Sequence, residues 1–359
     1  MPSSRLCRTG RSLRCRLMAG PSRPVARLFL LLFAVLILCA SCRKKTVWHT
    51  DYDAALQDAK AQGKELFVLF SGEDWDGKTA GFRTDVLNTE EFTAFARDRY
   101  VLLNIDLSEA EQANAIAAPD ADERAKADAA RLQSAIDAKN TVIRRYGISS
   151  YPTVCILSNE GYVLSFVQYN EGLNSPSVLT DVLDELAPAM ADVSAALAQV
   201  QGAAGVEKVR AIDRLYTVTP EVGRRPLAAL VREVPSLDPG NESGLVGKYE
   251  FIRAYDEAIE NLSEGKNEGV VDSFVTLAEQ GHLNPAQKLE AYYNAAYLMA
   301  LLGDSDYDRM FELLQKAQDV DPENVRMEDI ADLKQMISRM RDIMNQDEGF
   351  LPGMKVQGD

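Results

Sequence analysis

Two largely apolar runs of strand length constrain the fold of this chain more than any other feature. Residues 66–70 read Leu-Phe-Val-Leu-Phe, and residues 100–106 read Tyr-Val-Leu-Leu-Asn-Ile-Asp. A strand that is apolar on both sides is covered on both faces of its sheet, as in parallel α/β sheets. Helix-forming sequence over residues 77–97 separates the two runs, so we expect a right-handed strand–helix–strand crossover.

A hairpin and flanking helices complete the first predicted unit. Residues 153–157 and 162–167 are two more apolar runs, and the Asn-Glu-Gly sequence between them predicts a β-hairpin. We expect a helix before the first strand and another after the hairpin, over residues 52–61 and 176–186. The Ala-rich, charged residues 108–140 predict an inserted helical arm, with capping signals at Ser108 and Asp120.

This order of elements is that of thioredoxin. Several short sequences also resemble the thioredoxin-like family that includes the C-terminal domain of periplasmic thiol-disulfide interchange proteins: Trp48 with residues 52–56, Gly63-Lys64, Phe70-Ser71-Gly72, Asp74-Trp75, Arg145-Tyr146-Gly147-Ile148, and Tyr151-Pro152-Thr153. Residues 48–187 therefore resemble a thioredoxin-like domain that carries the insertion 108–140. In that family a Trp precedes a Cys-x-x-Cys pair, so Trp75 would be that Trp and Pro152 the cis proline facing the pair.

Both redox cysteines of that motif are absent. Trp75 is followed by Asp76, Gly77, Lys78 and Thr79, so Asp76 and Thr79 stand at the degenerate redox-site positions. A thiolate at a helix N-terminus is stabilised by unpaired N–H groups and by the helix dipole. Asp76 can use the same groups as an N-cap by accepting from the N–H of Lys78 or Thr79, a contribution of about 1 kcal/mol. We interpret the turn as a retired redox site rebuilt as a helix cap.

Three other chemistries at or near this turn have less support. A calcium site made of Glu73, Asp74 and Asp76 lacks the distal bidentate carboxylate of known calcium loops. Aspartyl-phosphate chemistry needs phosphate-cradling glycines and a partner cation that the segment does not provide. Cys155 could serve as a lone redox thiol, but a free Cys in an apolar strand is usually a small buried hydrophobe. We expect no thiol-disulfide turnover and no metal or other cofactor.

The resemblance also implies a peptide groove. In thioredoxin-like proteins the segment before the cis proline presents its backbone to an extended peptide, a form of strand addition that needs no thiol. Trp75, Tyr151, Pro152 and Thr153 would line this groove. The fold alone also explains Pro152, because a cis X-Pro bond shapes the start of a strand. Both interpretations stay open at this point.

Residues 1–41 differ in kind from the rest of the chain. They hold seven Arg and no acidic residue, and their apolar run, residues 28–40, is shorter than the approximately 20 residues of a bilayer span. This pattern predicts a secretory signal peptide, with Met18 as an alternative start. Residues 38–42, Leu-Cys-Ala-Ser-Cys, resemble the lipobox of bacterial lipoproteins. Cys42 would then be lipidated, with residues 42–47 as anchor and linker on a periplasm-facing membrane surface. Ordinary secretion is the alternative.

Charge and composition exclude several kinds of partner. Beyond residue 41 the chain has 32 basic and 54 acidic residues, a net charge of about −22, which repels nucleic acids and anionic lipid headgroups. Cys155 is the only cysteine beyond Cys42, so no disulfide is expected. His49 and His282 are far apart in sequence and leave little material for a His-based site. We expect proteins or peptides of the cell envelope as partners, and no nucleic acid.

An all-α region is predicted after the first unit. From about residue 188 to residue 345, apolar residues recur at helical spacing, and short breaks divide the helices into hairpins. Residues 307–317 resemble a tetratricopeptide repeat, whereas the earlier helix pairs lack that signature. A final helix is expected over residues 326–344, and residues 346–359 would form a tail.

Two groups of side chains in this region each have two possible interpretations. Asp304, Asp306 and Asp308 alternate as in a calcium loop, but Arg309 stands where such a loop needs Gly, which favours a helix start. The tyrosines of residues 292–297 would line a binding face or form part of the helical core.

The sequence thus predicts an exported, lipid-anchored protein with an α/β thioredoxin fold followed by an all-α helical-hairpin domain. The expected function is non-catalytic binding or scaffolding of proteins or peptides in the bacterial cell envelope. One alternative is a thiol-disulfide oxidoreductase or isomerase relative that works through Cys155 or a borrowed thiol. Another is a chaperone for exported proteins.

Overall fold

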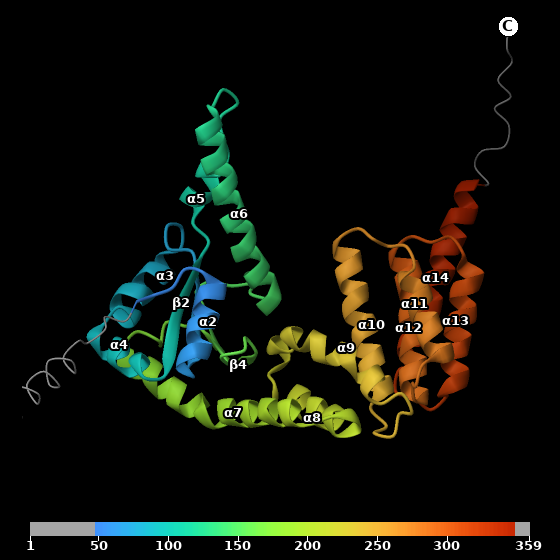
Figure 1. The fold of residues 1–359 in the computed structure, drawn as a ribbon. Helices are drawn as coiled ribbons and strands as arrows, with labels where there is room; N and C mark the ends of the chain where they lie inside the picture. Colours follow the sequence, from blue (N-terminus) through green and yellow to red (C-terminus); the bar gives the residue numbers. More distant parts are fainter. Residues whose placement is uncertain (1–46, 349–359) are drawn as a thin grey trace, which may run out of the picture. The chain divides into compact units, whose positions relative to one another are not determined.

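The computed structural model describes residues 47–348 of the chain (Figure 1). The predicted signal peptide, the alternative start at Met18, and the lipidation site Cys42 lie outside the described residues.

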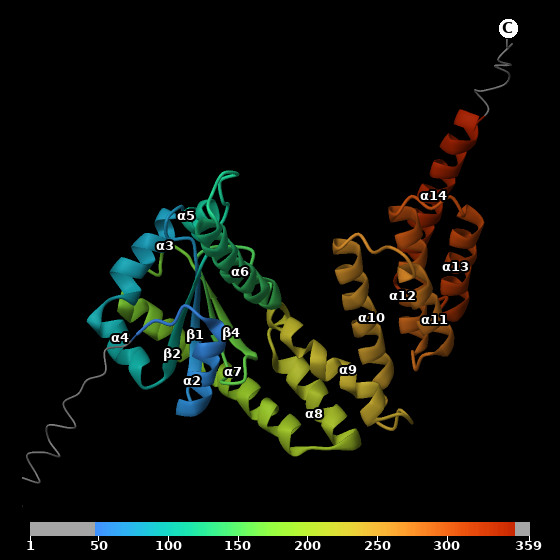
Figure 2. The same cartoon turned by 45° about the horizontal axis from the view of Figure 1, so that its top comes forward.

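A four-stranded sheet with the order β2-β1-β3-β4 forms the centre of the first part of the chain (Figures 1 and 2). The strands are β1 (Glu65–Ser71), β2 (Tyr100–Asp106), β3 (Thr153–Leu157) and β4 (Val163–Gln168). β1 runs parallel to β2 and antiparallel to β3, and β3 and β4 form an antiparallel hairpin. The predicted crossover between the first two strands and the predicted hairpin are both confirmed.

Alternate residues of the central strand belong to two separate apolar clusters. Leu66, Val68 and Phe70 pack with residues of α2 (Tyr52–Gln62) and with the last turns of α6 (Glu123–Tyr146). Phe67 and Leu69 pack on the opposite side with residues of α4 (Glu90–Arg97) and α7 (Pro176–Gly202). Burial on both faces explains why residues 66–70 of the strand are all apolar, rather than every second one.

Helix α3 (Gly77–Phe82) follows β1 and continues into a single π-helical turn, Arg83–Leu87. The predicted insertion contains α5 (Glu109–Asn114) and the first part of α6. Ser108 caps α5 as predicted, but the cap of α6 is Asp122 and not Asp120. Asp122 is the residue directly before the first helical position, which places its carboxylate within reach of the N–H of Ala125 at 2.7 Å.

The helix that follows the hairpin was expected to end at residue 186, and that prediction is wrong. α7 continues through Pro188 to Gly202. Burial explains this extension, because Met190, Val193 and Leu197 join the same apolar cluster as the sheet, which outweighs the backbone hydrogen bond lost at the proline. The division of the chain between residues 187 and 188 therefore falls within a continuous helix, and as a domain boundary it stays a prediction.

The remainder of the described chain is largely helical. It contains α8 (Gly205–Val218), α9 (Ala228–Leu237), α10 (Val246–Ser263), α11 (Val270–Gln280), α12 (Pro285–Leu301), α13 (Tyr307–Val320) and α14 (Met327–Glu348), with two short 3-10 turns, Glu221–Gly223 and Arg225–Leu227. Residues from α10 to α14 form an apolar cluster of their own. α14 extends into the segment that was predicted as a tail from residue 346. None of the helices described between residues 47 and 348 is both long and apolar enough to span a bilayer.

The structure answers the two questions that the sequence left open in this helical region, the role of the alternating aspartates and that of the tyrosines. Asp306 is the N-cap of α13 and accepts from the N–H of Arg309 at 3.0 Å, so the helix-start reading is confirmed. Tyr292 is buried in the helical core, whereas Tyr297 is 44% exposed and stacks on Tyr293. The stripe is thus part core and part surface.

Candidate functional site

The turn between β1 and α3 is closed by Asp76. The backbone N–H of Asp76 donates to the carbonyl of Gly72 at 2.7 Å, and its carboxylate accepts from the N–H groups of Lys78 at 3.3 Å and Thr79 at 3.1 Å. The predicted N-cap is confirmed. These hydrogen bonds satisfy two of the N–H groups that are left without partners at the start of α3.

The two degenerate redox-site positions also contact each other. The hydroxyl of Thr79 donates to Oδ2 of Asp76 at 2.6 Å, and Thr79 is fully buried. A hydroxyl bound to a carboxylate is a strong, charge-assisted hydrogen bond. It fixes the turn, but neither group can carry the electron pair that thiol-disulfide exchange transfers, since that chemistry requires sulfur.

An aromatic surface lies next to this turn. Trp75 is 43% exposed, and its ring lies edge-on to that of Tyr151, with centroids 5.6 Å apart. The indole N–H donates to the carbonyl of Leu107 at 2.6 Å. Gly72 permits this position, because a Cβ there would lie 2.2 Å from the Trp75 ring. We refer to Trp75 and Tyr151 as the aromatic pair.

The loop before β3 supplies the other predicted groove residues. The Tyr151–Pro152 peptide bond is cis, as the resemblance implied. Pro152 and Thr153 are buried, and the Thr153 hydroxyl donates to the carbonyl of Ser150 at 2.8 Å. The side chain of Thr153 thus holds the loop, and the accessible part of the predicted groove consists of exposed Trp75 and partly buried Tyr151.

Glu73 belongs to a network that ties the turn to the end of β2. Its carboxylate accepts from the side-chain amide of Asn104 at 2.9 Å and lies 2.7 Å from a guanidinium nitrogen of Arg83. The hydroxyl of Ser71 lies 2.8 Å from the side-chain oxygen Oδ1 of Asn104 and 2.9 Å from Oδ1 of Asp106, which also accepts from the N–H of Glu73. Sequence reasoning missed this network. Its signal was a polar residue, Asn104, inside an apolar strand.

Asp74 ties the same turn to the insertion. Its carboxylate accepts from the Ser108 hydroxyl at 2.6 Å and from the N–H groups of Glu109 and Ala110 at 3.1 and 2.9 Å. Hydrogen bonds from Ala110 and Ser108 lower the pKa of Asp74. Each of Glu73, Asp74 and Asp76 therefore has its own protein partners. Within residues 47–348 no group of acidic, His and Cys residues is arranged to hold a metal ion.

Cys155 lies in the interior of the sheet. It is fully buried on β3, between Val68 of β1 and Phe166 of β4. Burial raises the pKa of its thiol well above the usual value. Since the thiolate is the reactive form, Cys155 is a packing residue in this conformation.

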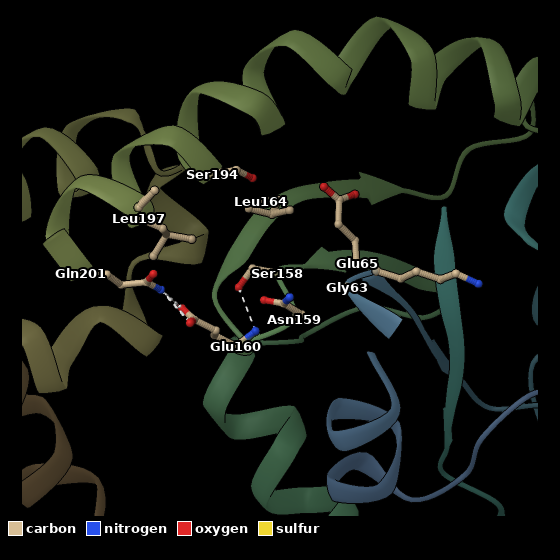
Figure 3. A pocket seen from close by; sticks show the side chains of 11 residues that line it. Gly63, Glu65, Ser158, Asn159, Glu160, Leu164, Ser194, Leu197 and Gln201 are labelled. Carbon is tan, nitrogen blue, oxygen red and sulfur yellow. Dashed lines mark hydrogen bonds between the residues drawn. The ribbon is translucent and has the colours of Figure 1, made fainter. Parts of the chain in front are cut away.

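A separate polar pocket of about 370 Å³ opens at the start of β1, at the other end of that strand from the Asp76 turn. Figure 3 shows Gln201 pointing at Glu160, and its amide donates to both carboxylate oxygens at 2.6 Å. Glu65 also lines the pocket, and burial raises its pKa. No residue of the Asp76 turn lines this pocket, so the two sites are separate.

Comparison with known proteins agrees with this geometry. Residues 47–158 match a family model described as thioredoxin-like. This part of the chain is a thioredoxin-like domain. The fold predicted from the resemblance is confirmed, as is the largely helical region that follows. Residues 245–347 match a second model, described as an uncharacterised protein C-terminal domain. The tetratricopeptide-like signature at residues 307–317 stays a prediction.

Individual relatives cover different parts of the chain. A Chlamydia pneumoniae protein named thioredoxin-related protein DsbJ is 38% identical over 60 residues, which are 17% of this chain and 17% of that relative. A Treponema pallidum (strain Nichols) protein named uncharacterized protein is 24% identical over 87% of this chain and 95% of its own length. A solved structure of a DsbH oxidoreductase aligns with 40% of this chain and 85% of its own, with 17% identity and a TM-score of 0.30.

Proposed function

We propose that the thioredoxin-like domain binds an extended polypeptide segment without exchanging disulfides. The observation that carries this proposal is the Asp76–Thr79 hydrogen bond beside the aromatic pair, of which Trp75 is exposed and Tyr151 is partly buried. The positions that would need sulfur for redox chemistry are committed to holding the turn. The neighbouring surface keeps one exposed ring, Trp75, and one partly accessible ring, Tyr151, and aromatic side chains of this kind anchor bound partners.

Backbone groups next to the aromatic pair support the same proposal. No hydrogen bond within residues 47–348 uses the backbone N–H or C=O of Tyr151, which directly precedes the cis peptide bond and β3. An extended peptide that runs past Tyr151 can pair with these two groups as an added strand. The rings of Trp75 and Tyr151 would then contact its side chains.

The proposed setting is the cell envelope. We propose that the chain is exported and held on a periplasm-facing membrane surface through a lipidated Cys42, with envelope proteins or peptides as its partners. The signal-like residues 1–41 and the lipobox-like sequence support export and anchoring. The net negative charge supports protein partners over nucleic acid or anionic lipid surfaces.

A peptide-binding experiment tests the function. Short cysteine-free peptides tiled over reduced, S-carboxymethylated ribonuclease A serve as probes, and fluorescence anisotropy measures their dissociation constants from the full-length protein. We expect a subset of the peptides to bind, and Trp75→Ala and Tyr151→Ala each to weaken that binding by about tenfold, the size of effect typical of buried aromatic anchors.

Tyr297→Ala is the matched control, because Tyr297 is 44% exposed and Trp75 is 43% exposed. It should leave binding unchanged. Asp76→Ala should lower the free energy of unfolding by about 1 kcal/mol through the lost cap and leave peptide binding intact. The proposal is wrong if no peptide binds, or if the variants of the aromatic pair bind as well as the wild type.

A further inference from the structure

A second cleft, of about 700 Å³, lies between α9, α10 and the two 3-10 turns before α9. Neither residue of the aromatic pair lines this cleft. Its volume is in the range of typical ligand sites, about 300 to 1,000 Å³. Sequence reasoning missed this cleft, because its lining residues come from separate segments of the chain.

One wall of the cleft is an apolar stripe on α10. Ile252, Tyr255 and Ile259 follow the spacing of one helix face and extend over about 10 Å at the rise of an α-helix. Tyr255 and Ile259 are about half exposed, and Val222 on the facing turn is 66% exposed. Large apolar side chains in such a continuous arrangement mark an interaction surface more often than isolated ones do.

Arginines supply the cationic part of the cleft. Five of them line it, at positions 145, 224, 225, 232 and 253, together with four carboxylates, at positions 221, 256, 257 and 260. The lining thus carries a net charge of about +1, whereas the whole chain carries −15. The cleft is locally cationic on a strongly acidic protein.

Arg225 and Arg232 keep most of their N–H donors without a hydrogen-bond partner in the described chain, whereas Arg253 and Arg224 are engaged. Arg253 is paired with Glu257 at 3.3 Å, and Arg224 donates to the carbonyl of Thr219 and covers the ring of Tyr216. Arg225 donates one N–H to a backbone carbonyl and makes no ion pair within the described chain. Arg232 has neither a hydrogen bond nor a close ion pair with residues 47–348. Burial raises the pKa of Asp256 in the same cleft, and the charges of Arg225 and Arg232 oppose that rise, so one carboxylate of the cleft already lies near both guanidinium groups.

We propose that this cleft binds an acidic polypeptide segment that carries a bulky apolar side chain. The guanidinium groups of Arg225 and Arg232 would receive carboxylates, whose geometry they match in bidentate pairs. The stripe on α10 would receive the apolar side chain. A short segment bound in the cleft would interact mainly with the charges of the cleft, because the protein's charges more than about 8 Å away are screened at physiological salt. A membrane or a nucleic acid would instead meet the negative surface around it.

Peptide selection tests this proposal. A random peptide library is displayed on phage and selected against the full-length protein with Trp75→Ala and Tyr151→Ala, so that the aromatic pair does not contribute. Counter-selection uses the same protein with Arg225→Gln and Arg232→Gln added. We expect the enriched peptides to be net negative and to contain at least one Leu, Ile, Phe, Tyr or Trp.

The selected peptides are then synthesised, labelled and titrated by fluorescence anisotropy. Arg225→Gln/Arg232→Gln should weaken binding by about tenfold or more, and Ile259→Gln should weaken it as well. The control Arg214→Gln should have no effect, since Arg214 is an exposed arginine on α8 outside the cleft.

Several results would overturn the proposal. These are the absence of any enrichment, enriched peptides that are neutral or basic, or equal binding to the Arg225→Gln/Arg232→Gln variant. Co-sedimentation with phosphatidylglycerol vesicles that depends on the same two arginines would assign the cleft to a membrane surface instead. Because the bait lacks the aromatic pair, failure here leaves the proposed function of the thioredoxin-like domain unaffected.

Discussion

A chain that carries Asp76→Cys and Thr79→Cys should gain thiol-disulfide exchange activity. The side chains at these positions already converge, with the Asp76 carboxylate and the Thr79 hydroxyl 2.6 Å apart. The N–H groups of Lys78 and Thr79, which now bond Asp76, would stabilise a thiolate at position 76 and lower its pKa. Residue 79 is buried, which protects the second sulfur of the pair. We expect insulin reduction at about ten times the dithiothreitol background or faster.

This experiment needs a background without other reactive thiols. Cys7, Cys15, Cys39 and Cys42 are changed to Ser, and Cys155 is retained because it is buried. Oxidation of the double variant should remove two hydrogen atoms from the intact mass, and the single variant Asp76→Cys should show neither that change nor turnover. If the double variant folds but forms no internal disulfide, the turn does not have the redox-site geometry that we assign to it.

Asn104→Leu should lower the free energy of unfolding by about 3 kcal/mol. Asn104 is 6% exposed and joins the Ser71 hydroxyl to the Glu73 carboxylate. Its loss removes one hydrogen bond to a charged group, worth about 1.5 to 3 kcal/mol, and one to a neutral group, worth about 1 kcal/mol. The Glu73 carboxylate keeps Arg83 and is therefore not left unpaired.

Urea unfolding followed by circular dichroism measures this loss. Asn267→Leu is the control, because Asn267 is exposed and should change stability by no more than about 0.5 kcal/mol. A change of under about 1 kcal/mol for Asn104→Leu would mean that water replaces the amide, and that the network does not hold the turn on β2.

Local patterns were sufficient to predict the sheet and the Asp76 cap. Residues 66–70 of strand β1 are all apolar because the strand is covered on both faces, and that run is visible in the sequence. The cap needs only Asp76 and the two N–H groups that follow within three residues. Both features depend on residues close together in the chain.

Features that depend on distant residues could not be predicted in the same way. Asn104 and Ser108, which hydrogen-bond Glu73 and Asp74, lie about 30 residues further along the chain, so the turn alone did not explain its carboxylates. The continuation of α7 past Pro188 depends on burial against other elements. The arginine-lined cleft exists only after α9 and α10 pack together.

The most direct test of the central claim is the thiol activity of the domain without added cysteines. The full-length protein with Cys155 as its only cysteine is assayed for insulin reduction and for labelling by a maleimide under native conditions. We predict insulin reduction at the dithiothreitol background and no labelling until the protein is unfolded, because burial keeps the thiol protonated and inaccessible. Turnover above that background that disappears in Cys155→Ala would contradict the account.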